Sequence, residues 1–181
     1  MNYFEILLIG IGLGMDALSV SVCKGLAMKK MNWNKAIKIG LYFGLFQALM
    51  PVLGFTLGVK FQKIVESLSH WISFGLLEII GINMIREALK NENSSLDDNV
   101  TLKEMLVLAI ATSIDALAVG ITFAILKVNI ITTAIIIGIT TFLMSVLGVK
   151  IGNKLGSKLK YKAEILGGII LITIGIKLLI T

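Results

Sequence analysis

The chain has 181 residues, of which 56% are hydrophobic and 15% are charged, and its mean hydropathy is +0.93. Soluble domains carry about 25% charged residues, and a globule of this length cannot bury so much Ile, Leu, Val and Gly. The single Cys excludes an intrachain disulfide framework. Composition therefore excludes a soluble domain and indicates an integral membrane protein.

Six apolar stretches each approach or exceed the ~20 residues that cross a bilayer as a helix. They lie at Tyr3–Ala27, Ala36–Gly58, Leu68–Ala88, Leu102–Leu126, Ile130–Gly152 and Ala163–Ile180. None has the ~10-residue alternation of membrane barrel strands. The first has no cleavage site after it, so we expect it to be retained. The sequence predicts an all-α membrane protein with six transmembrane helices.

The two halves of the chain resemble each other. Asp16-Ala17-Leu18-Ser19-Val20 in the first span matches Asp115-Ala116-Leu117-Ala118-Val119 in the fourth. The glycines of the second span match glycines of the fifth, and a Gly-Ile pair of the third matches one in the sixth; the pairs are Gly44 with Gly138, Gly54 with Gly148, Gly58 with Gly152, and Gly81 with Gly175. We expect a three-helix repeat at 1–90, a cytoplasmic polar linker at 91–101, and a second repeat at 102–181. Because three spans is an odd number, the second repeat must be inverted, as in many secondary transporters.

Lys and Arg side chains set the expected orientation. The loops that follow the first, third and fifth spans hold twelve of them, against four on the opposite side. The positive-inside rule places the twelve in the cytoplasm, so both termini are expected outside the cell membrane. The net charge of +6 is thus explained by orientation rather than by nucleic acid. Lys24 is interpreted as an interfacial residue rather than as a partner of Asp16.

The repeat brings Asp16 and Asp115 to similar depth near the middle of the membrane. A lone carboxylate there costs about 2.5–3.5 kcal/mol on insertion scales, and two at one depth repel unless a cation or a proton lies between them. A cation or proton site is favoured over two protonated acids that bond neighbouring helices. Glu78 is a third acid near mid-depth. It either binds the cation or relays protons, or it has a structural role.

Neutral oxygen donors accompany the two aspartates. Pro51 has no N–H, so the carbonyl of Gln47 loses its helical partner, and the Gln47 amide lies at mid-depth; a simple kink is the alternative. Ser19 and Thr112 lie three residues from Asp16 and Asp115 on the same helix faces. Thr141 and Ser145 occupy the repeat positions of Gln47 and Pro51. Such oxygen ligands suit Mg²⁺, Ca²⁺ or Mn²⁺, whereas the His and Cys clusters typical of Zn²⁺ or Cu⁺ are missing.

Five segments carry a family resemblance: GMDALSVSVCKGL, FGLFQALMPVLG, HWISFGLL, ATSIDALAVG and AEILGGIILI, which begin at residues 14, 43, 70, 111 and 163. Over essentially its whole length the chain resembles the MntP family of small bacterial manganese efflux pumps, in the wider lysine-exporter-like superfamily. The resemblance implies Mn²⁺ export across the cell membrane, with Asp16 and Asp115 as functional residues.

No ATP-binding loop is present, so pumping is expected to use an ion gradient, with protons returning on the acids. Mn²⁺ is then a transported substrate in a lipid bilayer, with no resident cofactor, and no protein partner is predictable. The expected metal-binding residues are Asp16, Asp115, Glu78, Gln47, Ser19 and Thr112.

Two alternatives stay open. The first is export of another divalent cation or of a small solute such as an amino acid, although no deep Arg or Lys is available for a carboxylate. The second is an intramembrane aspartyl protease, whose G-x-G-D pattern is missed by one residue in GLGMD (12–16).

Overall fold

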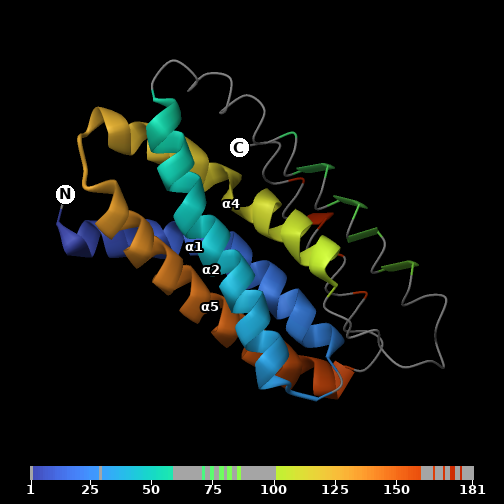
Figure 1. The fold of residues 1–181 in the computed structure, drawn as a ribbon. Helices are drawn as coiled ribbons and strands as arrows, with labels where there is room; N and C mark the ends of the chain where they lie inside the picture. The colour runs from blue at the N-terminus through green and yellow to red at the C-terminus, as the bar shows by residue number, and fades with distance from the viewer. Residues whose placement is uncertain are drawn as a thin grey trace.

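A computed structural model describes residues 2–28, 30–58 and 101–159, with isolated positions between 71 and 86 and between 165 and 176. It contains four long helices (Figure 1): α1 (Tyr3–Ala27), α2 (Trp33–Leu57), α4 (Leu102–Ile125) and α5 (Ile130–Leu159). All four are long and apolar enough to cross a membrane. The predicted spans Leu68–Ala88 and Ala163–Ile180 fall mostly outside the described residues; the positions described within them are helical.

The predicted helix bounds agree closely at α1 and α4, whereas α2 begins three residues earlier than expected and α5 is longer than predicted. The apolar stretch stops at Gly152, but α5 continues through Asn153 and Lys154 to Leu159. Hydropathy reports where apolar side chains end, and backbone hydrogen bonding continues for two turns beyond that point. The bound expected for the fifth span at Gly152 was therefore wrong.

Polar side chains set the starts of the helices. Asn32 Oδ1 accepts from the Lys35 N–H at 3.1 Å, and Thr101 Oγ1 accepts from the Glu104 N–H at 3.4 Å. Asn129 Oδ1 likewise accepts from the Thr132 N–H at 3.3 Å. Each satisfies one of the N–H groups that a first turn leaves without a helical partner.

The described helices expose many large apolar side chains, and they bury several polar ones. The exposed positions on α5 recur every four residues; they are Ile131, Ile135, Ile139, Leu143, Leu147, Ile151 and Leu155. In contrast, Thr133, Thr141 and Ser145 of the same helix are fully buried. Large apolar patches on soluble monomers are rare, so this arrangement is that of helices surrounded by lipid.

Helices α1 and α5 lie side by side and run in the same direction, as do α2 and α4, while α2 and α5 cross in opposite directions (Figure 1). The contacts of the glycines give the directions. Gly10 packs on Ile137 and Gly25 packs on Val149 further along, so the numbering rises together on α1 and α5. Helices α1 and α4, which share the Asp-Ala motif, therefore run in opposite directions, and so do α2 and α5.

Three helix crossings are close enough to require glycine. A Cβ added at Gly54 would lie 2.0 Å from the Leu117 carbonyl oxygen, and one added at Gly148 would lie 2.8 Å from that of Leu18. These two contacts join positions that the sequence repeat relates. At the third crossing Gly44 and Gly138 face each other, and a Cβ on either would lie 2.8–2.9 Å from the other's carbonyl oxygen. Small residues thus let the backbones touch, as is common in membrane helix packing.

The hydrophobic core gathers at one end of the bundle, where α1 and α5 end and α2 and α4 begin. Lysines mark this end, so we call it the basic end; they are Lys24, Lys35, Lys38, Lys103, Lys150 and Lys154. The core here includes Met28, Ile39, Phe43, Met105 and Val149. The described core cluster therefore lies toward the basic end.

Candidate functional site

The two aspartates that the sequence singled out lie near the middles of their helices, Asp16 on α1 and Asp115 on α4, and both are half-buried. Their helices run in opposite directions and share a smaller interface than α1 with α5 or α2 with α4. Each aspartate precedes a residue that forms a close crossing, since Leu18 and Leu117 supply the carbonyls that face Gly148 and Gly54. The aspartates thus flank equivalent crossings.

Gln47 reaches from α2 to the Asp16 region of α1. Its side chain is 1% exposed, and Nε2 donates to the Leu13 carbonyl oxygen at 2.9 Å. Leu13 lies three residues before Asp16, about one helical turn away. The other amide atom, Oε1, is buried and has no hydrogen-bond partner among the described residues. Gln47 therefore brings an unused acceptor to the core of the bundle.

Thr141 and Ser145 of α5 add unused hydroxyls to the same region. Both side chains are fully buried, and neither Oγ1 of Thr141 nor Oγ of Ser145 has a partner in the described part of the chain. Thr141 faces α1 at Gly14, where an added Cβ would lie 3.3 Å from Oγ1. Ser21 of α1, beside the Gly148 crossing, also has a buried hydroxyl without a partner among the described residues.

A buried polar group without a partner costs about 1–3 kcal/mol, so these four oxygens on α1, α2 and α5 need an explanation. The side chains of Gln47 and Thr141 contact α1 at Leu13 and Gly14, within one turn of Asp16. Amide and hydroxyl oxygens beside a carboxylate are the donor types that a hard cation takes.

Ser19 and Thr112 use their hydroxyl protons within their own helices. Ser19 Oγ donates to the Met15 carbonyl oxygen at 2.9 Å, and Thr112 Oγ1 donates to that of Leu108 at 3.0 Å. Ser113, beside Thr112, donates to the Ala109 carbonyl oxygen at 2.6 Å. Such bonds satisfy the hydroxyl donors and leave the oxygen lone pairs available.

Glu78 is described as a single helical position, half-buried, with Oε1 buried and unpartnered among the described residues. The span around it falls largely outside the described residues. Within the described part of the chain, no three His, Cys, Asp or Glu side chains come together. A cation site there would combine carboxylates with neutral oxygens.

Sequence reasoning missed one ion pair. Lys24, interpreted as an interfacial residue, instead pairs its Nζ with Oε1 of Glu104 on α4, and the two side chains are 13% and 28% exposed. The signal was present, because Lys24 lies in the last turn of α1 and Glu104 in the first turn of α4. Antiparallel helices bring those two turns to the same end.

A hydrogen bond at the basic end was also missed. Asn153 of α5 is buried, and its Nδ2 donates to the Met28 carbonyl oxygen at 2.8 Å. It ties the end of α1 to the extra turns of α5 that lie beyond the predicted span.

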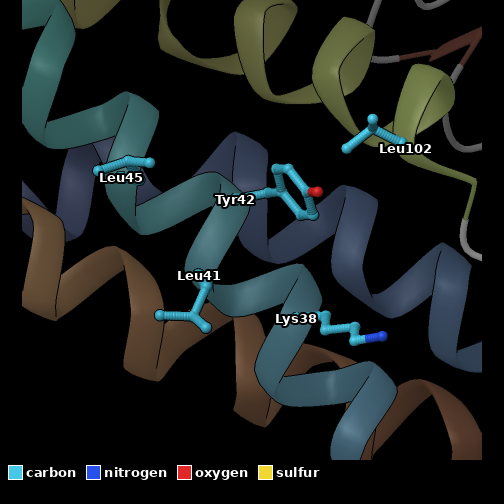
Figure 2. A pocket seen from close by; sticks show the side chains of 5 residues that line it. All are labelled: Lys38, Leu41, Tyr42, Leu45 and Leu102. Carbon is cyan, nitrogen blue, oxygen red and sulfur yellow. The ribbon is translucent and has the colours of Figure 1, made fainter.

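Figure 2 shows a cavity of about 450 Å³ between α2 and the start of α4. Lys38 lies at one end of it, and the other described lining side chains are Leu41, Tyr42, Leu45 and Leu102. The described lining thus offers one positive charge and no carboxylate.

A family model and the curated relatives of the chain point to the same protein family. Residues 30–179 match the family model Mntp, described as "Putative manganese efflux pump". Proteins with that description, named MntP, are 56% identical in Acetivibrio thermocellus, 52% in Mannheimia succiniciproducens and 49% in Campylobacter jejuni. Each alignment covers 99% of this chain and 91%, 96% and 97% of the respective relative. No solved structure matches the chain.

Proposed function

Because the chain belongs to the MntP family of manganese efflux pumps, we propose that it exports Mn²⁺ from the cytoplasm across the cell membrane. The observation that carries this proposal beyond membership is that two buried oxygens without described partners, Gln47 Oε1 and Thr141 Oγ1, belong to side chains that contact α1 within one turn of Asp16. Mn²⁺ is a hard cation that takes carboxylate, carbonyl and hydroxyl oxygens.

The proposed frame is a pair of inverted three-helix repeats. Two observations support it: α1 and α4 run in opposite directions, and the Gly54–Leu117 contact is the repeat equivalent of Gly148–Leu18. The proposed pseudo-two-fold axis passes between Gly44 and Gly138, which are repeat equivalents and face each other. An axis of this kind lies in the membrane plane and places the substrate site at the midplane.

In the proposed site, Asp16 and Asp115 supply the two negative charges that balance one divalent ion. Gln47 Oε1 is the neutral ligand with the most direct support, because its amide is fixed to α1 by the bond to Leu13 and leaves this acceptor unused. The lone pairs of Ser19 and Thr112 complete the expected set. Glu78 is proposed as a ligand or as a proton relay.

Export requires an energy source, and we propose exchange for protons. Carboxylate ligands must be deprotonated to bind a metal, so Mn²⁺ binding releases protons and weakens as the pH falls. On the outer side, protonation then favours release of Mn²⁺, and the protonated acids carry protons inward on the return step. With the twelve basic loop residues in the cytoplasm, the basic end faces inward and both termini face outward.

The primary test is Mn²⁺ accumulation in bacteria that lack their own Mn²⁺ exporter. Expression should lower cellular Mn²⁺ and raise tolerance to it. D16N and D115N should each abolish export while membrane insertion and abundance stay normal, because each keeps the size of the side chain and removes one ligand charge. E5Q is a matched control, since Glu5 is exposed at the start of α1. Near wild-type export by either aspartate variant would refute the shared site.

The same cells distinguish the alternative substrates. If cellular Mn²⁺ is unchanged while the content of another divalent metal or of amino acids changes, that solute is the substrate in place of Mn²⁺. Proton coupling is tested separately in liposomes loaded with Mn²⁺ and a pH-sensitive dye. Transport that moves no protons and ignores an imposed pH gradient would refute coupling while leaving Mn²⁺ export intact.

A further inference from the structure

We propose that a polar pocket at the end of the bundle opposite the basic end binds a phosphate-type oxyanion. The pocket has a volume of about 240 Å³, which is that of about eight water molecules at ~30 Å³ each. It lies between the start of α1 and the turn that joins α4 to α5, which are neighbours in Figure 1. Tyr3, Lys127, Asn129, Thr132 and Thr133 supply its described polar lining.

The first attraction for an anion is the start of α5. Asn129 caps the Thr132 N–H through Oδ1, and its carbonyl oxygen accepts from the Thr133 N–H at 3.1 Å. The N–H groups of Ile130 and Ile131 precede these and point out of the helix end. A helix start carries a partial positive charge of about half a unit, and α5 is 30 residues long.

The second attraction is an unused donor in the pocket wall. Thr133 is fully buried, lines the pocket, and its Oγ1 has no hydrogen-bond partner among the described residues. Thr140 of the same helix, in contrast, donates its hydroxyl proton to the Ile136 carbonyl oxygen at 2.8 Å. An oxyanion in the pocket would accept the hydrogen bond that Thr133 does not make with any described residue.

The third attraction is the full charge of Lys127. This residue follows the end of α4 with φ of 52°, the only non-glycine with positive φ among the described residues. Helices usually place Gly in this position because a side chain is strained there. The lysine thus occupies a position where glycine would be less strained, and it is one of the residues that line the pocket.

The turn after α4 uses carbonyl groups of the helix end. The last carbonyls of α4 are occupied by the turn itself, since Thr122 O accepts from the Leu126 N–H and Phe123 O from the Val128 N–H, both at 3.1 Å. No carboxylate belongs to the described lining. A lysine, a helix start and an unused hydroxyl together select an anion, so this pocket differs in charge preference from the proposed Mn²⁺ site. Its ligand is either the phosphate of a phospholipid headgroup or free phosphate, which present the same oxygens.

The test uses the purified full-length protein in neutral detergent. One arm titrates inorganic phosphate at constant ionic strength and follows Tm. The other arm measures retention of phosphatidylglycerol against diacylglycerol by native mass spectrometry, because the two differ by the phosphate headgroup. A saturable response to phosphate identifies a free anion as a ligand, and selective retention of phosphatidylglycerol identifies the headgroup.

Two variants separate binding from folding. K127G removes the charge and relieves the positive φ, so it should raise Tm without ligand and abolish the response to ligand. T133V keeps the side-chain shape and should weaken affinity about tenfold or more, as expected for a lost hydrogen bond to a charged group. K150Q and T56V are controls, since Lys150 and Thr56 are exposed and outside the pocket. No saturable response in either arm, or wild-type affinity in both K127G and T133V, would overturn the proposal.

Discussion

Alanine at Gly54 should destabilise the protein, although alanine favours a helix. The added Cβ would lie 2.0 Å from the Leu117 carbonyl oxygen, roughly 1.3 Å closer than the ~3.3 Å of a close carbon–oxygen contact. The oxygen is part of the α4 backbone, and the position of the Cβ is fixed by the α2 backbone. No side-chain rotation can therefore relieve the overlap, and α2 must move away from α4. Overpacking of this kind costs about 3 kcal/mol or more, against about 1 kcal/mol gained from helix propensity.

Two matched variants calibrate that loss. Gly12 on α1 has no atom within 4 Å of an added Cβ, so G12A should gain up to about 1 kcal/mol. At Gly148 the distance to the Leu18 carbonyl oxygen is 2.8 Å, so G148A should fall between G12A and G54A. The free energies of unfolding of G12A and G54A should differ by about 3 kcal/mol, which is ~6–12 °C in Tm for a chain of this length. Thermal unfolding in detergent measures the order, and equal Tm for G54A and G12A would refute the reasoning.

Three further changes test single contacts. E104Q should lower stability by about 1–3 kcal/mol, less than the 3–5 of a fully buried pair because Glu104 is 28% exposed; K24E/E104K should recover part of the loss, and a double-mutant cycle without coupling would contradict the pair. N153A should cost about 1–3 kcal/mol in thermal unfolding, because it leaves the buried Met28 carbonyl without its donor; an unchanged Tm would show that another donor replaces it. Q47L should reduce Mn²⁺ affinity measured by calorimetry at least tenfold, and unchanged affinity would remove Gln47 from the ligand set.

The sequence was sufficient to predict the four described helices because lipid imposes a simple rule: a long apolar run must be a helix. It also paired Gly54 with Gly148 as equivalent positions, and the structure places both at close crossings. The ion pair of Lys24 with Glu104 was missed because hydropathy says nothing about which helix ends meet. The sequence also could not predict that Gln47 Oε1 is an unused acceptor, because this depends on the contact between the Gln47 amide and the Leu13 carbonyl in the folded chain.

The close approaches at the glycines bear on how such a bundle can change shape. Between α1 and α5, a Cβ added at Gly152 or Gly25 would lie 2.0 or 2.2 Å from a carbonyl oxygen of the other helix, and between α2 and α4 the same distances hold at Gly54 and Gly120. Each parallel pair is thus held by contact between backbones, which no side-chain rotation can loosen. A change of shape that keeps these contacts must move the two pairs against each other as units. The α2–α5 crossing, where Gly44 and Gly138 face each other, is the place where such a movement would be felt.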